Sequence, residues 1–418
     1  MKHNSRPALL VLTSSFPNSP DDETCGYIRD FARSLSNEFN VTVLAPPDLN
    51  ATAWPADRFR LMRSRSIVPL RLDPFQAGRD LNNLAEASLA ARFVTLLSLV
   101  TFSLRAIHLA LRADVVCSHW MFPSGLIGAL ICRLLGKPHI VLEHSGSLHL
   151  LSKTRAGKMV AKFLINSSRQ VVAVSADLKK KLIDLCPQAK DVIEIIPMGV
   201  KLSGLTKPVR INASSLASET VSPFTILFIG RLTRIKGLDV LLRAASGLRN
   251  VRVVVGGDGE CRNELEQLAQ DLSVNASFLG CVNASQRQRL LSDCDVAVIP
   301  SRILTDGRTE GTPVVCLEAM AAGRVVIASR AGGLPEVITD KQNGLLFDPE
   351  DHDALREKIK TILEDEVLRQ NVEREAIRSA MEYSWDRTSK RYAQLIRKAL
   401  LADDIIVSRR IEVSTGNH

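Results

Sequence analysis

The chain has 418 residues, of which 45% are hydrophobic and 24% are charged. This is the composition of a folded globular protein, and it excludes a fibrous or intrinsically disordered one. Because 418 residues exceed one ordinary hydrophobic core, we expect two domains. The eight cysteines form no Cys-x-x-Cys pair and no zinc-binding spacing, so we expect reduced thiols in a cytoplasmic protein. The apolar run Ala8–Leu12 is too short for a secretory signal and predicts a first strand.

The net charge of +9 is concentrated in the first half of the chain. Residues 1–200 contain 24 Lys and Arg against 16 Asp and Glu, a net charge of +8. Residues 201–418 contain 30 against 29, a net charge of +1. The asymmetry indicates that the first half meets an anionic partner. Aromatic residues are only 5% and no nucleic-acid motif is present, which favours an anionic membrane surface or a phosphorylated lipid over nucleic acid.

Short apolar runs alternate with helical patterns along the chain, which predicts parallel sheets with helices on both faces. A polar, serine-rich linker over 201–222 is expected to separate an N-terminal domain, residues 1–200, from a C-terminal domain, residues 223–385. The remaining predicted strands of the first half are Val41–Leu44, Val115–Cys117, His139–Leu142, Val171–Val174 and Ile193–Ile196. Those of the second half are Thr225–Ile229, Val251–Val255, Ala276–Leu279, Val296–Ile299, Val325–Ala328 and Gly344–Phe347.

The segment Leu89–Arg112 is apolar enough to raise the question of a transmembrane helix. Its longest uncharged stretch, Phe93–Leu104, has 12 residues, fewer than the roughly 20 that a spanning helix needs. We therefore expect a helix packed into the core, with a helix lying on a membrane surface as the alternative.

An arginine-rich segment, Trp54–Arg79, precedes this helix. Its aromatic residues, Trp54, Phe59 and Phe75, are interleaved with the basic ones. One interpretation is a solvated loop, and the other is a surface that docks an acceptor or a membrane. The arginines stand at positions 58, 60, 63, 65, 71 and 79.

Two carboxylates flank a predicted helix start in the second half of the chain. Glu310 lies in the preceding loop, and Glu318 falls in the second turn of the helix. Thr312 is predicted as the N-cap, Pro313 as the first helical residue, and Gly323 as the stop. Carboxylates accept hydrogen bonds from diol hydroxyls, and free amides at a helix start favour an anion. Taken alone, the pattern is explained by two surface acids beside a capped helix. The neighbouring segments favour a ligand-binding site instead.

Turns suited to a ligand follow the other predicted strands of this half. Arg231 and Lys236 come after Thr225–Ile229 and place two cations near a helix N-terminus, as a protein would to hold a diphosphate without a metal. The turn Gly256–Glu260 lacks the third glycine of a dinucleotide fingerprint, which excludes an NAD site. The glycines of the turn Ala331–Glu336 allow the backbone to approach a ligand closely.

Together these motifs resemble glycosyltransferase family 4, a family of retaining enzymes. The resemblance covers residues 5 to about 398 and implies an α/β GT-B fold, with two doubly wound Rossmann-like domains facing across a cleft. We also expect a helix over about 386–402 to pack back on the N-terminal domain. The ordered motifs are Gly230-Arg231…Lys236-Gly237, Gly257-Asp258-Gly259, Pro300-Ser301, Glu310-Gly311-x-Pro313…Glu318-Ala319-Met320-Ala321-x-Gly323, Gly332-Gly333-x-Pro335-Glu336 and Asn343-Gly344.

The resemblance also implies roles for residues of the second half. Arg231 and Lys236 would bind the diphosphate of the donor, and Glu318 would hold the ribose hydroxyls. Glu310 would hold the sugar hydroxyls and is a candidate catalytic residue. Backbone contacts to the donor sugar and phosphates are expected from Gly311, Thr312, Pro313 and Val314.

In the first half, two segments carry the resemblance. Gly26, in a loop after the first strand, would approach the donor phosphate, although Cys25 stands where the family often has another glycine. His144, in the segment Glu143-His144-Ser145-Gly146, would lie beside the anomeric carbon and is the second candidate catalytic residue. His119 matches a further family landmark that is structural or faces the acceptor.

The implied activity is a retaining, metal-independent transfer of a sugar from a nucleotide-diphosphate sugar to a glycan or lipid-linked acceptor. Such an enzyme would serve surface polysaccharide or glycolipid biosynthesis, in the cytoplasm or peripherally on the inner face of the membrane. No cofactor is expected, because the nucleotide sugar is a co-substrate. Asp293-Cys294-Asp295 directly precedes a strand and is not expected to bind a metal. The alternatives are a sugar-nucleotide epimerase of the same fold and a non-catalytic nucleotide-sugar-binding partner.

Overall fold

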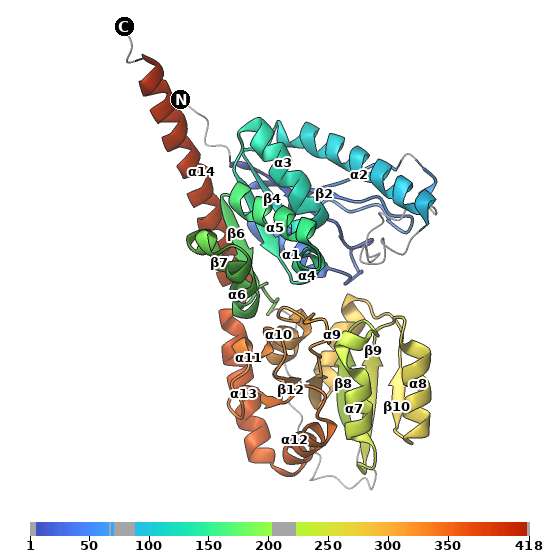
Figure 1. Ribbon diagram of the computed structural model, residues 1–418. Coiled ribbons are helices and arrows are strands. Elements are labelled where there is room, and N and C mark those ends of the chain that lie inside the picture. The colour runs from blue at the N-terminus through green and yellow to red at the C-terminus, as the bar shows by residue number, and fades with distance from the viewer. Residues whose placement is uncertain (1–5, 67, 71–87, 203–222, 416–418) are drawn as a thin grey trace. The chain divides into compact units, whose positions relative to one another are not determined.

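The computed structural model describes residues 6–66, 68–70, 88–202 and 223–415, and the chain divides into two compact units (Figure 1). Unit 1 comprises Met1–Pro197 and Trp385–His418, and unit 2 comprises Met198–Ser384. The C-terminal helix α14 (Trp385–Thr415) is therefore part of unit 1. The predicted linker, 201–222, lies outside the described residues except for its first two positions.

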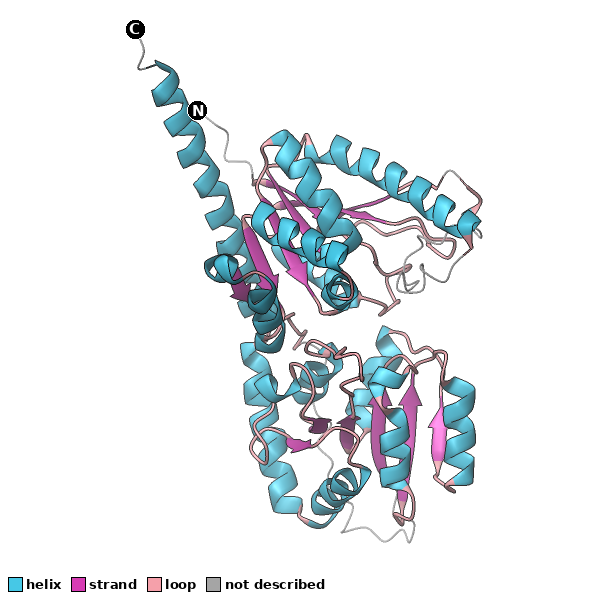
Figure 2. Ribbon diagram, in the orientation of Figure 1, coloured by secondary structure: helices cyan, strands magenta, loops and turns pink. Residues whose placement is uncertain are grey.

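Unit 1 is built on one parallel sheet. Its strands are β1 (Ala8–Leu12), β2 (Asn40–Ala45), β3 (Arg60–Arg63), β4 (Val115–His119), β5 (His139–Glu143), β6 (Gln170–Ala173) and β7 (Ile193–Ile195). They lie in the order β3-β2-β1-β4-β5-β6-β7. Figure 2 shows the strands in magenta and the helices in cyan. The chain thus winds outward in both directions from β1 and β4, as in a doubly wound fold.

Right-handed crossovers place the helices of unit 1 in two layers. Its helices are α1 (Gly26–Leu35), α2 (Leu89–Ala110), α3 (Leu126–Leu135), α4 (Gly146–Ser152), α5 (Arg155–Ser167), α6 (Ala176–Leu185) and α14, with a short π-helical turn at Met121–Gly125 and a 3₁₀ helix at Pro187–Val192. α2 packs against α3, and α3 against α5, in one layer. α1 and α14 pack together in the other, where the buried Tyr392 donates a hydrogen bond to the Ile196 carbonyl at 2.8 Å.

The twelve predicted strands are present to within two residues at each end, and the structure adds β3. Arg60–Arg63 lies at the edge of the sheet, so the interpretation of this part of the arginine-rich segment as a solvated loop is wrong. The guanidinium of Arg63 donates to the carbonyls of Pro46 at 3.1 Å and Pro17 at 2.6 Å. Because both ends of this short edge strand are charged, the sequence has no apolar run there that would predict a strand.

The aromatic residues of the same segment pack inward. The rings of Trp54 and Phe59 lie with their centroids 5.4 and 6.0 Å from that of the buried Phe16. They are therefore part of the local core and do not form a surface for inserting into a membrane. The remaining predicted members, Arg71, Phe75 and Arg79, lie outside the described residues.

Helix α2 packs only one of its sides in the core. Phe102, Ala106 and Ala110 are buried in an apolar cluster of unit 1, and Thr95 and Ser98 are buried with them. On the other side, large side chains such as Leu89 and Phe93 are exposed. The predicted helix is present, and the expectation of core packing is confirmed for one side of it and wrong for the other.

Unit 2 has a second doubly wound parallel sheet. Its strands are β8 (Phe224–Ile229), β9 (Val251–Gly256), β10 (Ala276–Phe278), β11 (Val296–Ile299), β12 (Val325–Ser329) and β13 (Leu345–Phe347), in the order β10-β9-β8-β11-β12-β13. The helices are α7 (Leu238–Ala245), α8 (Arg262–Asp271), α9 (Ala284–Asp293), α10 (Val314–Ala321), α11 (Leu334–Val337), α12 (His352–Glu364) and α13 (Glu366–Glu382), with a 3₁₀ helix at Arg234–Lys236.

Strand alternation divides the core of unit 2 between the two faces of its sheet. Ile226 and Phe228 of β8 belong to an apolar cluster with α7, α8 and α12, whereas Leu227 and Ile229 belong to a cluster with α10 and α13. Successive side chains of a strand point to opposite faces, so both faces of this sheet are buried. The long apolar strands thus fix the positions of the loops that follow them.

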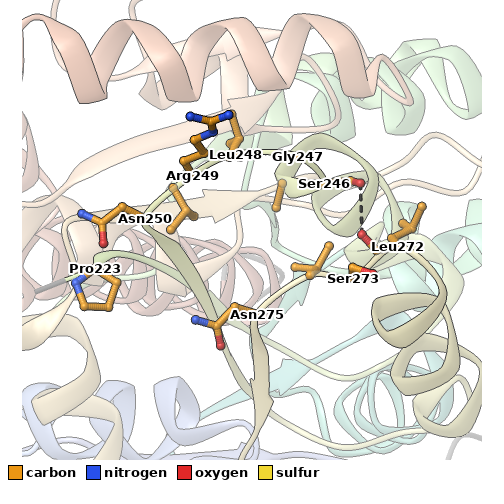
Figure 3. Close-up of a pocket in the computed structure, with 12 residues that line it drawn as sticks. Pro223, Ser246, Gly247, Leu248, Arg249, Asn250, Leu272, Ser273 and Asn275 are labelled. Carbon is orange, nitrogen blue, oxygen red and sulfur yellow. Dashed lines mark hydrogen bonds between the residues drawn. The ribbon is translucent and has the colours of Figure 1, made fainter.

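A hollow of about 600 Å³ lies at the amino ends of the unit 2 strands (Figure 3). Pro223, Asn250 and Asn275, which line it, directly precede β8, β9 and β10. Among the described residues around this hollow, none belongs to the predicted site. The predicted site lies at the opposite, carboxyl ends of the strands.

Candidate functional site

Four loops meet at the carboxyl ends of β8, β9, β11 and β12. Backbone hydrogen bonds join neighbouring loops, so their positions depend on one another. The carboxyl ends at the centre of a doubly wound sheet are where such folds bind ligands. The bonds run from Gly230 N–H to Gly256 O (2.9 Å), Leu232 N–H to Asp258 O (2.8 Å), Arg302 N–H to Ile235 O (2.8 Å) and Gly333 N–H to Gly311 O (3.1 Å).

Two positions must be glycine because the backbones of neighbouring loops lie so close together that a Cβ atom would clash. Gly257 has φ +140°, and a Cβ there would lie 1.8 Å from the Gly230 carbonyl oxygen. Gly332 has φ +55°, and its Cβ would lie 2.0 Å from the Glu310 carbonyl oxygen. In the structure these glycines allow contact with the protein's own backbone, whereas the sequence suggested contact with a ligand.

Lys236 and Glu310 form a direct ion pair in this loop cluster. Lys236 Nζ lies 2.5 Å from Glu310 Oε1, and the Ser301 hydroxyl donates to Glu310 Oε2 at 2.6 Å. Both charged side chains are about four-fifths buried. A carboxylate with an ammonium and a hydroxyl as partners is fixed in orientation, yet one side of the pair stays open to solvent. The structure thus brings together two residues that the sequence assigned to different parts of the donor.

Glu318 is held by a residue that the sequence interpretation did not include. Arg287, on helix α9, approaches Glu318 Oε2 with Nε at 2.7 Å and with a terminal guanidinium nitrogen at 2.5 Å. Both contacts use Oε2, so Oε1 keeps its capacity to accept a hydrogen bond from a ligand. Arg287 lies 31 residues from Glu318 in the chain, and no local pattern connects them.

Arg231 and Thr233 offer polar groups that the folded chain does not use. Arg231 is exposed, and no ion-pair partner for it is found in the part of the chain that the structure describes. The Thr233 hydroxyl is buried and makes no hydrogen bond with any described residue. A cation and a hydroxyl donor in one turn, close to Lys236, are groups that can bind an anion.

Helix α10 begins one residue later than predicted. Pro313, with φ −60° and ψ 122°, is its N-cap, and Val314 is its first residue. The Pro313 ring fixes φ but leaves ψ extended, so the N-cap expected at Thr312 is wrong. No side chain caps this helix among the described residues. Glu318 lies in the second turn, and Gly323, with φ +68°, follows the C-cap, as predicted.

In unit 1 the loop after β5 places His144 among other rings. Its Nε2 lies 2.9 Å from His119 Nδ1, and the two imidazoles are stacked. The rings of Tyr27 and Trp120 lie with centroids 5.2 Å from that of His144. Desolvation lowers the pKa of both histidines below the ordinary value, so both are neutral at neutral pH and one ring donates to the other.

The buried carboxylate of Glu143 organises this region. It accepts hydrogen bonds from the backbone N–H groups of Met121 at 2.9 Å, Ser145 at 2.9 Å and Leu148 at 3.2 Å, and from the Ser147 hydroxyl. Burial raises its pKa, and these four donors oppose that shift. Ser145 is held at φ +101°, a strained conformation next to His144. Glu143 therefore fixes the loops that carry both histidines.

Replacing Glu143 by glutamine is expected to destabilise unit 1 by roughly 2–3 kcal/mol, because the amide nitrogen faces buried donors and leaves one or two of them without a partner. Urea unfolding measures the change. Glu194→Gln, the same substitution on a carboxylate that pairs with exposed Lys398, should shift stability by less than about 0.5 kcal/mol. Equal effects of the two substitutions would show that the Glu143 hydrogen bonds do not hold the loops.

Gly26 begins helix α1 and makes a tight contact of its own. Its N–H donates to the Glu23 carbonyl at 3.1 Å, and a Cβ would lie 2.5 Å from the Glu23 carboxylate. That carboxylate pairs with Arg29 at 2.9 Å. Cys25, which replaces the expected glycine, has φ +55°, a conformation that favours glycine. The contact of Gly26 with a donor phosphate stays a prediction.

Asp295, one of the two acids around Cys294, has a structural role. Asp295 accepts a hydrogen bond from the Thr225 N–H at 2.8 Å, at the start of β8. Within the described ranges, no group of three or more His, Cys, Asp or Glu residues could hold a metal ion.

Comparison with known proteins identifies relatives of both units. A family model described as Glycosyltransferase Family 4 matches residues 26–203, and one described as Glycosyl transferases group 1 matches residues 217–379. The uncharacterized glycosyltransferase MJ1607 of Methanocaldococcus jannaschii is 30% identical over 305 residues, covering 69% of this chain and 76% of the relative. The D-inositol 3-phosphate glycosyltransferase of Acidothermus cellulolyticus is 28% identical over 331 residues, covering 72% and 71%.

Solved structures share the fold along almost the whole chain. Sucrose-phosphate synthase from Thermosynechococcus elongatus superposes with a TM-score of 0.74 at 21% identity, covering 94% of this chain and 100% of the other. Anabaena Alr3699/HepE, solved in complex with UDP, superposes with a TM-score of 0.68 at 16% identity and covers 94% and 100%. At these identities the likeness shows a common architecture.

Proposed function

Because this chain belongs to glycosyltransferase family 4 and has the α/β GT-B fold of two Rossmann-like domains, we propose that it is a retaining enzyme using a nucleotide-diphosphate sugar. The acceptor is a glycan or a lipid-linked glycan, and the pathway is surface polysaccharide or glycolipid biosynthesis at the cytoplasmic side of the membrane. The strongest support is the Lys236–Glu310 ion pair at the carboxyl ends of the unit 2 strands. It places a cation and a hydroxyl acceptor side by side, as a sugar phosphate requires.

The donor is held by unit 2. Arg231, Lys236 and the uncapped amides at the start of α10 bind its diphosphate, and the backbone of Gly311–Val314 approaches the sugar and phosphates of the donor. Glu318 accepts the ribose hydroxyls through Oε1, while Arg287 holds Oε2. Glu310 accepts hydroxyls of the sugar. In this assignment each charged group has a partner in the donor or in the protein.

The reaction builds charge on the leaving group. As the bond from the anomeric carbon to the phosphate oxygen breaks, the sugar becomes oxocarbenium-like and the nucleoside diphosphate becomes more negative. Lys236, Arg231 and the α10 amides stabilise that negative charge. The departing phosphate takes the proton of the acceptor hydroxyl, whose oxygen bonds to the anomeric carbon on the same face. The configuration is therefore retained, and neither a metal nor a cofactor takes part.

His144 is proposed to donate or accept a neutral hydrogen bond in this reaction. Its lowered pKa and its contact with His119 keep it uncharged near neutral pH. It therefore does not supply a positive charge to the leaving group. Arg231 and Lys236 carry that task in the proposal.

A panel of UDP-, GDP- and ADP-sugars tests the proposal directly. Protein treated with EDTA is incubated with each donor and with glycan, lipid-linked and D-inositol 3-phosphate acceptors, and the anomeric configuration of the product is read by NMR. Retention without metal supports the proposal. Inversion, or activity that is lost with EDTA and restored by manganese, would overturn it. Epimerised donor without any acceptor identifies an epimerase, and binding without turnover a non-catalytic partner.

A further inference from the structure

The solvent side of helix α2 is apolar, whereas the solvent side of an ordinary surface helix is polar. Its inward side buries Phe102 and Ala106 together with the polar Thr95 and Ser98. Large apolar side chains that are 47–81% exposed recur along its outward side at helical spacing. They are Leu89, Phe93, Leu96, Val100 and Leu104, with Leu111 at the C-cap.

The neighbouring helices extend this surface. α3 packs beside α2, and α5 packs beside α3 (Figure 1). α3 exposes Leu130 and Leu134, and α5 exposes Met159. All three helices cover the same face of the unit 1 sheet. We call the exposed apolar residues of α2, α3 and α5 the apolar face. Large exposed apolar side chains on neighbouring helices are typical of an interaction site.

The charged residues of α2, α3 and α5 are all basic. Between Leu89 and Ala176 the chain has ten Lys and Arg residues but only two acids, Asp114 and Glu143. Asp114 accepts a hydrogen bond from the Ala8 N–H, and Glu143 is buried. The exposed basic residues are Arg92, Arg112, Arg133, Lys153, Arg155, Lys158 and Lys162.

We propose that the apolar face of α2, α3 and α5 docks on an anionic lipid bilayer. The large side chains enter the interface between headgroups and acyl chains, and the surrounding Lys and Arg residues meet the lipid phosphates. A second copy of this chain fits less well, because pairing two such faces would oppose like charges. The surface differs from the arginine-rich segment suggested by the sequence, whose Arg63 and Trp54 contact the protein itself.

α2 lies along the bilayer surface in this proposal and does not cross it. By length and composition it is the one described helix that could span a membrane, and 28% of its most apolar 18-residue window is buried. Its inward side packs on the sheet of unit 1, where Phe102 and Ala106 are fully buried. Crossing a bilayer would expose that side to lipid and remove it from the core, whereas lying on the surface keeps both contacts.

Flotation with vesicles tests the proposal on the full-length protein without any substrate, so the result does not depend on the proposed glycosyl transfer. Vesicles of phosphatidylcholine with phosphatidylglycerol should bind the protein at low salt, and high salt or phosphatidylcholine alone should weaken binding. The variant Phe93→Ser/Leu96→Ser/Leu104→Ser should reduce the bound fraction by about tenfold or more. The matched control Leu279→Ser/Ile303→Ser/Val367→Ser removes exposed apolar residues from unit 2 and should bind like wild type.

Two charge variants distinguish the apolar face from the arginine-rich segment. Arg133→Gln/Lys158→Gln/Lys162→Gln should weaken vesicle binding, whereas Arg58→Gln/Arg60→Gln/Arg65→Gln should change it little. The substituted side chains are exposed, so thermal melting should show folded variants. Absence of wild-type flotation at low salt would overturn the proposal, as would equal binding by the apolar-face variant and wild type. Concentration-dependent dimers that the Phe93/Leu96/Leu104 variant abolishes, without flotation, would assign the face to self-association instead.

Discussion

Replacing Lys236 by alanine is expected to weaken binding of the donor's nucleoside diphosphate by roughly 10- to 100-fold, and Arg231→Ala somewhat less. In the proposed donor site, each change removes a charge-assisted hydrogen bond to the diphosphate. Lys236→Ala has a second effect, because it leaves Glu310 without its cation 2.5 Å away. The unpaired carboxylate then repels the phosphate. Titration calorimetry with the nucleoside diphosphate of the preferred donor measures both losses.

The control for these variants is Arg249→Ala, which removes the same charge from unit 2 at the opposite end of its sheet. It should leave nucleotide affinity within about twofold of wild type, because a charge remote from the site is screened. The double variant Lys236→Ala/Glu310→Gln should recover part of the affinity lost in Lys236→Ala, since repulsion by Glu310 is removed. Wild-type affinity in both single variants would reject a diphosphate site at this turn.

The strands and their order of appearance followed from the sequence because both sheets are buried on both faces. Apolar runs such as Val296–Ile299 and Val325–Ser329 have no solvent side that would interrupt them. The same reasoning failed at Arg60–Arg63, where an edge strand carries charges that suit its exposed position. It failed in part at α2, whose apolar composition predicted a helix packed in the core but whose outward side is exposed. The composition of a helix does not show which of its sides packs on the core and which faces solvent.

The candidate site was predicted in part, for an equally physical reason. Loops that follow neighbouring strands must meet, so the turn with Arg231 and the loop with Glu310 could be placed at one end of the sheet from the sequence. Contacts between side chains of elements that are distant in the sequence could not be predicted in this way. The Arg287–Glu318 pair and the Lys236–Glu310 pair depend on how α9 and the 3₁₀ turn pack. These pairs change the expected behaviour of variants, because each acid also holds a cation of the protein.

The two acids should therefore respond differently to the same substitution. Glu318→Gln is expected to weaken nucleoside-diphosphate binding by about tenfold, because a charged acceptor for the ribose is lost and Arg287 loses its ion pair. Glu310→Gln should leave nucleotide affinity equal to wild type or slightly tighter, because Lys236 is released from its partner. Glu357→Gln, on the exposed surface of α12, is the matched control and should resemble wild type.

The kinetics of sugar transfer should also distinguish Glu310→Gln from Glu318→Gln. Glu310→Gln should lower the turnover number on the order of 100-fold, because the lost carboxylate acts on the sugar as charge develops in the transition state. Glu318→Gln should mainly raise KM for the donor, because the ribose contact is the same before and during the reaction. Equal losses of nucleotide affinity in both variants would contradict this division. A large rise in KM for Glu310→Gln with unchanged turnover would place Glu310 in ground-state binding alone.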